Sequence, residues 1–388
     1  MTSWVEARRT HLEVRIDGVL DTACVSATCS FGFDQRYAEA TITRTGGATL
    51  TISYWSAVEL RMGTTPGLGA TVRFAGYVVP IDNDLYPIAN VLHCKGRLYR
   101  AAFVRNQTVL GTDYAPPGGP FISDQQMVQN VLTACGVPFT AGLIGGTGKS
   151  LGSEWLNLAD PLTPSPFTWG EDQAGLDFIE QLDAASVPDS GAGRYRTVES
   201  LDGTIHRILF ATVPNATADF SFAEGVDVLE ARISRDPTGA ANRVMVSGAP
   251  NGLGGTIPNE PGVFRSTKGS PTAPYLPSGL PNGPDGYPSV TTAFSSPLLE
   301  KEAIADTGAV LACEAVATFL LAEYNCVLDT LEFSTPRDDL LGPGQTIHLT
   351  SSRLGLTDST RHYWLQRLEI IMDERGVFTQ RLVCLRRS

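Results

Sequence analysis

The amino-acid sequence predicts a mainly β protein with an α+β part, built as two small antiparallel β-barrels separated by an α+β domain. Three observations lead to this prediction. Short runs rich in Val, Ile, Thr and aromatic residues fill both ends of the chain, turn residues separate these runs, and helical periodicity is confined to the middle and to one later segment. The chain of 388 residues, 42% of them hydrophobic, is long enough to bury several cores.

Residues 1–105 are predicted to form the first barrel. Candidate strands follow one another from HLEVRIDG at residue 11 to RLYRAAFVRN at residues 97–106, and several alternate in polarity. Turn signals separate them at Asp17-Gly18, Gly46-Gly47 and Asp82-Asn83-Asp84. Regular short strands at this spacing are typical of a small antiparallel barrel or sandwich.

Residues 106–220 are predicted to form the α+β domain. Ser123 is placed to cap a helix whose apolar residues share one face, and Gly136 is placed to end it. A second helix is predicted over 171–185, because its apolar residues recur at helical spacing. Two strand patterns follow, joined by Asp202-Gly203, which is a hairpin signal.

Residues 221–249 and 326–388 are predicted to form the second barrel, because strand patterns return in both segments. Residues 250–325 are predicted to be a Pro/Gly-rich excursion followed by a helix. The stretch 250–297 holds ten Pro and eight Gly, too many for a packed element. Apolar residues at helical spacing predict the helix over 299–325.

The charge balance bears on the partners of the chain. A net charge of −12 without a basic cluster argues against binding along nucleic acid, because neutralising phosphates needs clustered Lys and Arg. The sequence contains no long apolar segment, and its N-terminus is charged, so we expect no stable membrane anchoring and a protein held in the cytoplasm until assembly. Only 18% of the residues are charged, which is typical of a surface hidden against partners.

Chemistry-bearing residues form no recognisable site. The seven cysteines and five histidines are scattered, so we predict no metal site and no cofactor. Cys94 and His93 are neighbours in a strand pattern and must face opposite sides, which argues against a nucleophile–base pair. The glycine-rich run at 145–150 has Leu143 where a phosphate loop needs its opening glycine.

Acidic pairs and aromatic residues give no stronger indication of chemistry. Glu171-Asp172, Asp82-Asp84 and Asp338-Asp339 fall in turns or helix starts, where carboxylates are favoured by capping and solvation. We therefore predict no catalytic residue.

Aromatic residues in strands usually belong to a core or an interface. Four of them could instead line a sugar groove: Tyr54, Trp55, Tyr77 and Tyr86.

Several segments, taken in order and spacing, match one known pattern. They are VRFAGYVVPI at 72–81, CKGRLYRAAFV at 94–104, ISDQQMVQNVLTACGVPF at 122–139, PFTWGEDQAGLDFIEQLDAASV at 166–187, DVLEARISRDPTGAANRVMVSG at 227–248 and LLGPGQTIHLTSS at 340–352. Together they resemble the phage tail hub family, which includes baseplate hubs, the late control protein D group and the N-terminal part of type VI secretion spike proteins. The stretch 250–297 has no counterpart in that pattern.

The resemblance implies a structural virion protein, the hub at the tip of a bacteriophage tail, assembled in the host cytoplasm and without enzymatic activity. It implies a homotrimer in which residues 1–105 dock on the tail tube and two barrels per chain present six similar surfaces to a hexameric tube. The implied partners are the tail tube or a distal tail protein, the tape-measure protein and a tip or spike protein. An acidic bore would repel DNA. The alternatives are a receptor- or carbohydrate-binding tail-tip module and a tail-associated cell-wall hydrolase.

Overall fold

The computed structural model describes most of the chain, in fifteen stretches. These are residues 11–45, 52, 55–63, 71–79, 91–107, 112–113, 122–147, 168–188, 192–211, 214–236, 243–250, 263–269, 291–295, 312–324 and 328–387. Among them, no helix combines the length and the apolar composition needed to cross a membrane.

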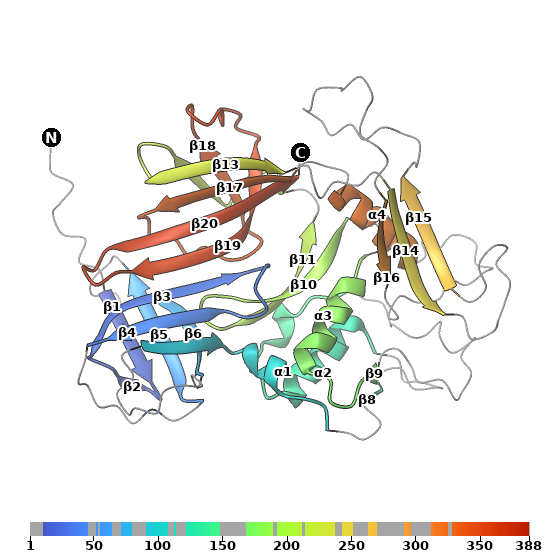
Figure 1. Cartoon of the computed structure of the whole chain (residues 1–388), viewed down its shortest axis with the longest axis horizontal. Coiled ribbons are helices and arrows are strands. Elements are labelled where there is room, and N and C mark those ends of the chain that lie inside the picture. The colour runs from blue at the N-terminus through green and yellow to red at the C-terminus, as the bar shows by residue number, and fades with distance from the viewer. Residues whose placement is uncertain are drawn as a thin grey trace.

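A 13-stranded sheet built from both ends of the chain dominates the structure (Figure 1). Its main path runs β13-β17-β20-β19-β3-β4-β7-β6-β5-β1-β2, and β18 joins β19 and β12 beside that path. The strands are β1 (His11–Ile16), β2 (Val19–Leu20), β3 (Cys24–Gly32), β4 (Glu39–Arg44), β5 (Ala57–Gly63), β6 (Val72–Val78), β7 (Val91–Gly96), β12 (Phe220–Ala223), β13 (Glu230–Asp236), β17 (Leu328–Thr335), β18 (Thr346–Thr350), β19 (His362–Met372) and β20 (Phe378–Arg387).

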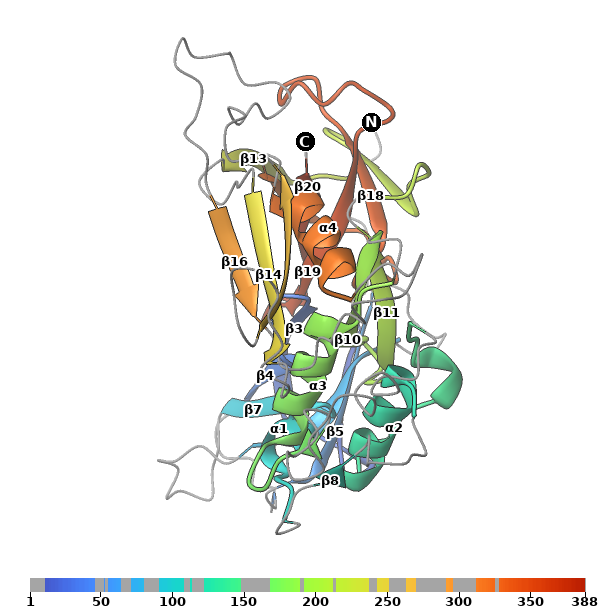
Figure 2. The same cartoon turned by 90° about the vertical axis from the view of Figure 1, so that its right-hand side faces the viewer.

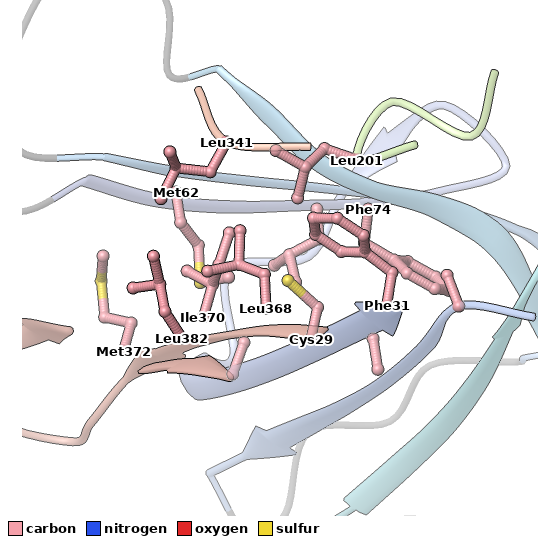
Figure 3. Packing of buried hydrophobic residues seen from close by; sticks show 14 of the residues in the cluster. Cys29, Phe31, Met62, Phe74, Leu201, Leu341, Leu368, Ile370, Met372 and Leu382 are labelled. Carbon is pink, nitrogen blue, oxygen red and sulfur yellow. The ribbon is translucent and has the colours of Figure 1, made fainter. Parts of the chain in front are cut away.

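The two ends of the chain meet where β3 pairs with β19. The ladder is antiparallel and runs from Ala27 opposite Met372 to Gly32 opposite Arg367. On its inner side Phe31 lies opposite Leu368 and Cys29 opposite Ile370, all of them buried (Figure 3). One hydrophobic core therefore continues under the strands of both ends.

The same strand order occurs twice in this sheet. The first unit runs β1-β5-β6-β7-β4-β3, and the second unit runs β12-β18-β19-β20-β17-β13. When the strands of each unit are taken in chain order, the first unit's β1, β3, β4, β5, β6 and β7 correspond to β12, β13, β17, β18, β19 and β20 of the second unit. Each strand of one unit has the same neighbours as its counterpart in the other. One pair differs in direction, because β1 is antiparallel to β5 whereas β12 is parallel to β18.

A second core belongs to the segment between the two units. Here α2 (Asp124–Ala134) and α3 (Gly175–Ala185) pack with α1 (Tyr99–Phe103), beside a hairpin of β10 (Gly193–Glu199) and β11 (Ile205–Ala211). We call these three helices and the hairpin the middle unit. Short elements β8 (Thr112–Asp113), η1 (Ala141–Leu143) and β9 (Thr168–Trp169) accompany it.

Local signals in this unit are confirmed by the structure. The Ser123 side chain accepts a hydrogen bond from the backbone N–H of Gln126, as an N-cap does, and Gly136 follows α2 with a φ of +66°. The predicted hairpin is present, and Gly203 in its turn has a φ of +75°. The second helix begins at Gly175 instead of 171, so Glu171 and Asp172 lie in the turn before it.

Residues between β13 and β17 form a separate small layer, which we call the insert. Strand β14 (Arg243–Pro250) pairs with β15 (Val263–Gly269) and with β16 (Thr291–Ser295), and α4 (Ala312–Tyr324) packs against β14 and β15 (Figure 2). The prediction that 250–297 holds no packed element is therefore wrong for β15 and β16. Strand β14, expected in the second barrel, belongs instead to this three-stranded sheet.

Two further expectations differ from the structure. Residues 97–106 were expected to be a strand, but they include the short helix α1, whose Ala101 is buried together with Leu98 just before the helix. The described strands of the two ends form one continuous sheet, in which no closed barrel is present. The two-barrel arrangement therefore stays a prediction.

The β3–β19 ladder should be sensitive to loss of its buried side chains. We expect Leu368→Ala to lower the free energy of unfolding by about 3 kcal/mol, because it leaves a cavity under the ladder. Chemical denaturation measures this. Glu369→Ala, on the outer face of the same strand, is the matched control and should cost less than about 1 kcal/mol. Equal effects of the two substitutions would show that the shared core is not formed in solution.

Candidate assembly surfaces

A row of polar side chains crosses the outer face of the large sheet. Each member lies directly opposite the next on a neighbouring strand, over eight strands, and because directly opposite residues of paired strands point to the same face, all members of the row share one face. The row is Glu230, Ser334, Arg381, Glu369, Ser30, Glu39, Lys95 and Tyr77. The opposite face is the hydrophobic core, so this polar face is the one that the sheet presents outward.

Charges on this face are paired across strands. Arg232 contacts Glu332 at 2.6 Å, Arg381 contacts Glu369 at 3.6 Å, and Lys95 pairs with Glu39. Arg367 and Glu230 stand on the same face as these pairs. Acidic and basic groups therefore balance here, and the expected acidic bore has no support from the described part of this face.

Strand β13 forms an edge of the sheet. It pairs with β17 on one side, and its other side has no partner among the described strands. Charged side chains cover this edge, which is how natural sheets prevent unspecific strand pairing. One of them, Arg235, reaches the buried carboxylate of Asp329 at 3.0 Å, which Arg361 also holds at 2.6 Å. The edge is thus both exposed and conformationally fixed.

A buried carboxylate joins the middle unit to the first unit. Glu199, at the end of β10, accepts hydrogen bonds from the backbone N–H groups of Arg97 at 2.6 Å, Ala38 at 3.3 Å and Leu98 at 3.4 Å. Burial raises the pKa of Glu199 to about 7, although these donors and the Arg97 charge act in the opposite direction. A Cβ on Gly96 would lie 2.1 Å from the carboxylate, so this junction requires glycine there.

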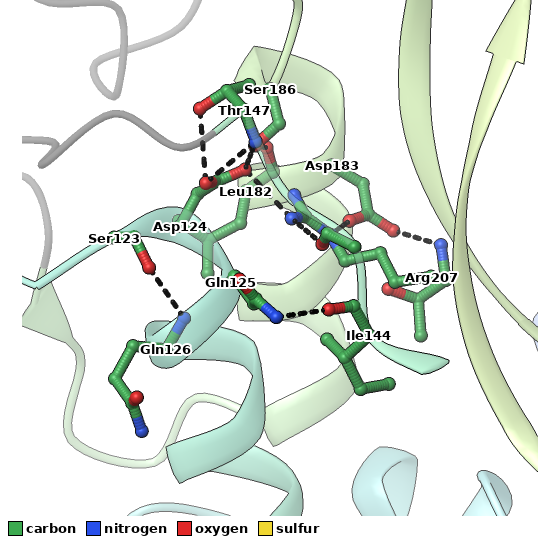
Figure 4. A network of polar contacts seen from close by, with 12 residues as sticks. Ser123, Asp124, Gln125, Gln126, Ile144, Thr147, Leu182, Asp183, Ser186 and Arg207 are labelled. Carbon is green, nitrogen blue, oxygen red and sulfur yellow. Dashed lines mark hydrogen bonds and ion pairs between the residues drawn. The ribbon is translucent and has the colours of Figure 1, made fainter. Parts of the chain in front are cut away.

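A buried ion-pair network holds the middle unit together (Figure 4). Arg207 of β11 donates to Asp183 of α3 at 2.7 Å, to Asp124 of α2 at 2.8 Å and to the Gly145 carbonyl at 2.8 Å. Burial opposes the Arg207 charge, but the carboxylates of Asp183 and Asp124 outweigh it, so the pKa of Arg207 is raised. Sequence reasoning missed this network because its members are far apart in the chain.

The glycine-rich run ends in this network. The backbone N–H and the hydroxyl of Thr147 both donate to Asp124, and a Cβ on Gly146 would lie 2.8 Å from the same carboxylate. A negative side chain thus takes the place where a phosphate loop would hold phosphate. Residues 148–150 lie outside the described residues.

The described cysteines and histidines do not assemble into a reactive site. Cys94 is buried while His93 is exposed, as strand alternation predicts. Burial raises the pKa of the Cys29 and Cys94 thiols to about 12, which disfavours the reactive thiolate. Within the described residues, no group of three or more His, Cys, Asp or Glu side chains could hold a metal ion.

Acidic pairs have structural partners where they are described. The buried Arg73 of β6 pairs with Asp338 and donates to the Asp339 carbonyl at 3.0 Å, which links the first unit to the loop before β18. Arg337 contacts the Asp339 carboxylate at 2.8 Å. The Asp82-Asp84 pair lies outside the described residues.

An aromatic cluster lies beside α1. Trp55 stacks on Tyr99, with ring centroids 5.8 Å apart, and meets Tyr77 and Phe103 edge-on at 5.7 and 5.3 Å. Trp55 has a φ of +68°, which is strained for a large side chain. Two of the four aromatic residues named from the sequence, Trp55 and Tyr77, thus meet, while Tyr54 and Tyr86 lie outside the described residues.

The fold is that of phage tail proteins, and the resemblance expected from the sequence is confirmed at this level. A tail protein from Neisseria meningitidis MC58 has a TM-score of 0.58 at 10% identity, over 97% of this chain and 96% of that one. The 43 kDa tail protein of prophage MuSo2 from Shewanella oneidensis has a TM-score of 0.58 at 9% identity, over 97% and 98% of the two chains. Prophage tail protein gp18 from Listeria monocytogenes EGD-e has a TM-score of 0.51 at 9% identity, over 96% and 94%.

Sequence comparison does not extend this result. No protein-family model matches the chain, and no curated protein matches it in sequence. At identities near 10% the likeness concerns the fold alone.

The Glu199 junction should make stability depend on pH. Its folded pKa of about 7 lies above the unfolded value of 4.5, so its contribution is fully present below pH 4.5 and is lost as the pH rises through 7. We expect the free energy of unfolding of the wild type to fall, relative to Glu199→Gln, by up to about 3 kcal/mol across this range. Denaturant titrations at several pH values measure the difference. Glu374→Gln, on an exposed turn, is the control and should keep the wild-type profile.

The Arg207 network should be costly to break. Asp124→Asn removes one of two carboxylates from a buried guanidinium, and we expect it to lower the free energy of unfolding by about 3 kcal/mol or more. Asp177→Asn on α3 removes a carboxylate from an exposed ion pair with Arg36 and should cost less than about 1 kcal/mol. Similar losses for both variants in chemical denaturation would contradict the burial of the network.

Proposed function

We propose that the chain is a tail hub, a structural virion protein of which three copies form a ring that adapts a hexameric tail tube to trimeric tip proteins. The observation that carries this proposal is the repeated strand order of the first and second units. A threefold ring of such chains presents six similar units, which is what equivalent contacts with a sixfold tube require.

The orientation of the two units supports this arrangement. Each step from β13 through β17, β20 and β19 to β3 is antiparallel, so β13 and β3 run in the same direction. The second unit therefore repeats the first along the sheet without being inverted. A repeat of this kind continues around a ring, whereas an inverted repeat would present opposite ends of its strands to the tube.

The exposed edge of β13 is where the ring would close between subunits. Within the chain, β19 of the second unit pairs with β3 of the first. An equivalent contact between chains would cover the free edge of β13. The polar face would then line the channel of the ring, where the tape-measure protein would lie, with balanced charges on its wall. Each unit would curl into one of the two expected barrels.

Partners are proposed for both ends of this ring. The tail tube or a distal tail protein would bind one rim of the sheet, and a tip or spike protein would bind the side that carries the middle unit. The protein would be located at the tail tip of the virion after assembly in the host cytoplasm.

The aromatic cluster favours a second candidate function, a receptor- or carbohydrate-binding module. Trp55 and Phe103 are 36% and 62% exposed, and such side chains bind sugar rings by stacking. In this cluster, however, Trp55 already stacks on Tyr99. We propose no hydrolase activity, because Asp338 and Asp339 are paired with arginine and Glu171 and Asp172 lie in a turn.

Oligomeric state tests the hub proposal directly. We expect mass photometry of the purified protein to give a dominant species of three times the 41.5 kDa chain mass. Arg232→Glu, which places a negative charge on the free edge beside Glu332, should shift the distribution toward monomer. A wild-type protein that stays monomeric at micromolar concentration, or forms dimers, would contradict the proposal.

A further inference from the structure

Two histidines meet across neighbouring strands of the second unit. His348 of β18 lies directly opposite His362 of β19 in an antiparallel ladder. Directly opposite residues of paired strands point to the same face of the sheet. Their imidazole rings have centroids 5.7 Å apart and an interplanar angle of 89°. Strand pairing thus brings together two histidines that look scattered in the sequence.

The separation of the two rings suits a shared metal ion. Zinc binds an imidazole nitrogen at about 2 Å, so two rings that share a tetrahedral ion have centroids about 5 Å apart. The observed 5.7 Å is close to this separation, and rotation about the side-chain torsions is enough to reach it. The paired strands therefore hold two ligands at chelating distance without a change of the backbone.

Backbone carbonyls fix the proton of each imidazole ring. His362 donates from Nδ1 to the Asn215 carbonyl at 2.9 Å, and His348 makes a weaker contact from Nε2 to the Asp358 carbonyl at 3.4 Å. A carbonyl can only accept, so in the neutral rings the lone pairs lie on the other nitrogens, Nε2 of His362 and Nδ1 of His348. Metal-binding histidines have such a partner for the second nitrogen, because it fixes the tautomer and the ring orientation.

The neighbouring cross-strand pair adds polar groups on the same face. Thr346 lies directly opposite Trp364, two residues along each strand from the histidines, so all four side chains share one face. Thr346 and Trp364 are both buried, and within the described residues the Thr346 hydroxyl and the Trp364 indole N–H have no hydrogen-bond partner. Buried polar groups without partners are costly, and ordered water usually satisfies them.

We propose that His348 and His362 bind one transition-metal ion of the zinc, nickel or copper type, with water in its remaining positions. Imidazole suits these ions, whereas Mg²⁺ and Ca²⁺ prefer oxygen ligands. The water ligands are the groups that the Thr346 hydroxyl and the Trp364 N–H would hold. His362 is 8% exposed and His348 is partly exposed, so the ion enters from the side of His348.

The nearest arginine is engaged on the other face of the sheet. Arg361 stands over the ring of Tyr363, which belongs to the hydrophobic core, and contacts the buried carboxylate of Asp329 at 2.6 Å. Its guanidinium therefore does not occupy the space between the two histidines.

A bound ion would act as a cross-link within the second unit. It would join β18 to β19 and strengthen the strand that also pairs with β3. Because the unfolded chain does not hold the two imidazoles together, the ion stabilises the folded state as its concentration exceeds the dissociation constant. This inference is independent of the proposed hub function, since it requires one chain only.

Isothermal titration calorimetry with ZnCl₂ tests the site in the full-length, untagged protein after treatment with EDTA. We expect one Zn²⁺ per chain, a higher melting temperature in its presence, and no heat of binding from MgCl₂. His348→Gln and His362→Gln should each weaken zinc binding by about tenfold or more. His93→Gln is the matched control, because it removes an exposed histidine whose cross-strand partner is Thr41, and it should bind zinc as the wild type does.

A wild type that binds no zinc at millimolar concentration overturns the proposal, as does zinc binding that survives His348→Gln or is equally lost in His93→Gln. Electron paramagnetic resonance of the wild type loaded with Cu²⁺ identifies the ligands without reference to stability. Coupling to two imidazole nitrogens, reduced to one in His348→Gln, is the expected spectrum, and a wild-type spectrum without imidazole coupling contradicts the site.

Discussion

The pairing of β3 with β19 is the constraint on which the rest of the structure depends. It joins strands from opposite ends of the chain into one sheet and continues one core beneath them, with Phe31 opposite Leu368. Without it, each unit would expose a strand edge and part of its apolar face. Its antiparallel direction also sets the second unit beside the first in the same orientation, so one ladder determines both the stability of the sheet and its repeat.

The middle unit and the insert lie outside the large sheet. The middle unit leaves the first unit after β7 and is fixed against it by Glu199, while Arg207 holds its own helices to its hairpin. The insert leaves between β13 and β17 and packs as a separate layer. Buried charged groups thus fix the middle unit against the first unit, and its helices against its hairpin. The polar face of the sheet is the surface that an assembly protein needs to keep accessible.

Local structure could be predicted from the sequence where local chemistry determines it. The Ser123 cap, the Asp202-Gly203 hairpin and the last four strands follow from periodicity and turn residues. The β3–β19 ladder could not be predicted, because residues such as Ser30 and Glu369 carry no signal that they will pair across the length of the chain. Short elements such as α1 and β16 were missed because few residues form each of them.

The central claim is that two halves of one chain occupy equivalent places in a ring. Electron cryomicroscopy of the assembled protein, reconstructed without imposed symmetry, tests it most directly. The expected result is a threefold ring in which the first and second units alternate around the channel and superpose by a rotation of about one sixth of a turn about its axis. A ring in which only one unit surrounds the channel, or in which the two units face opposite rims, would contradict the claim.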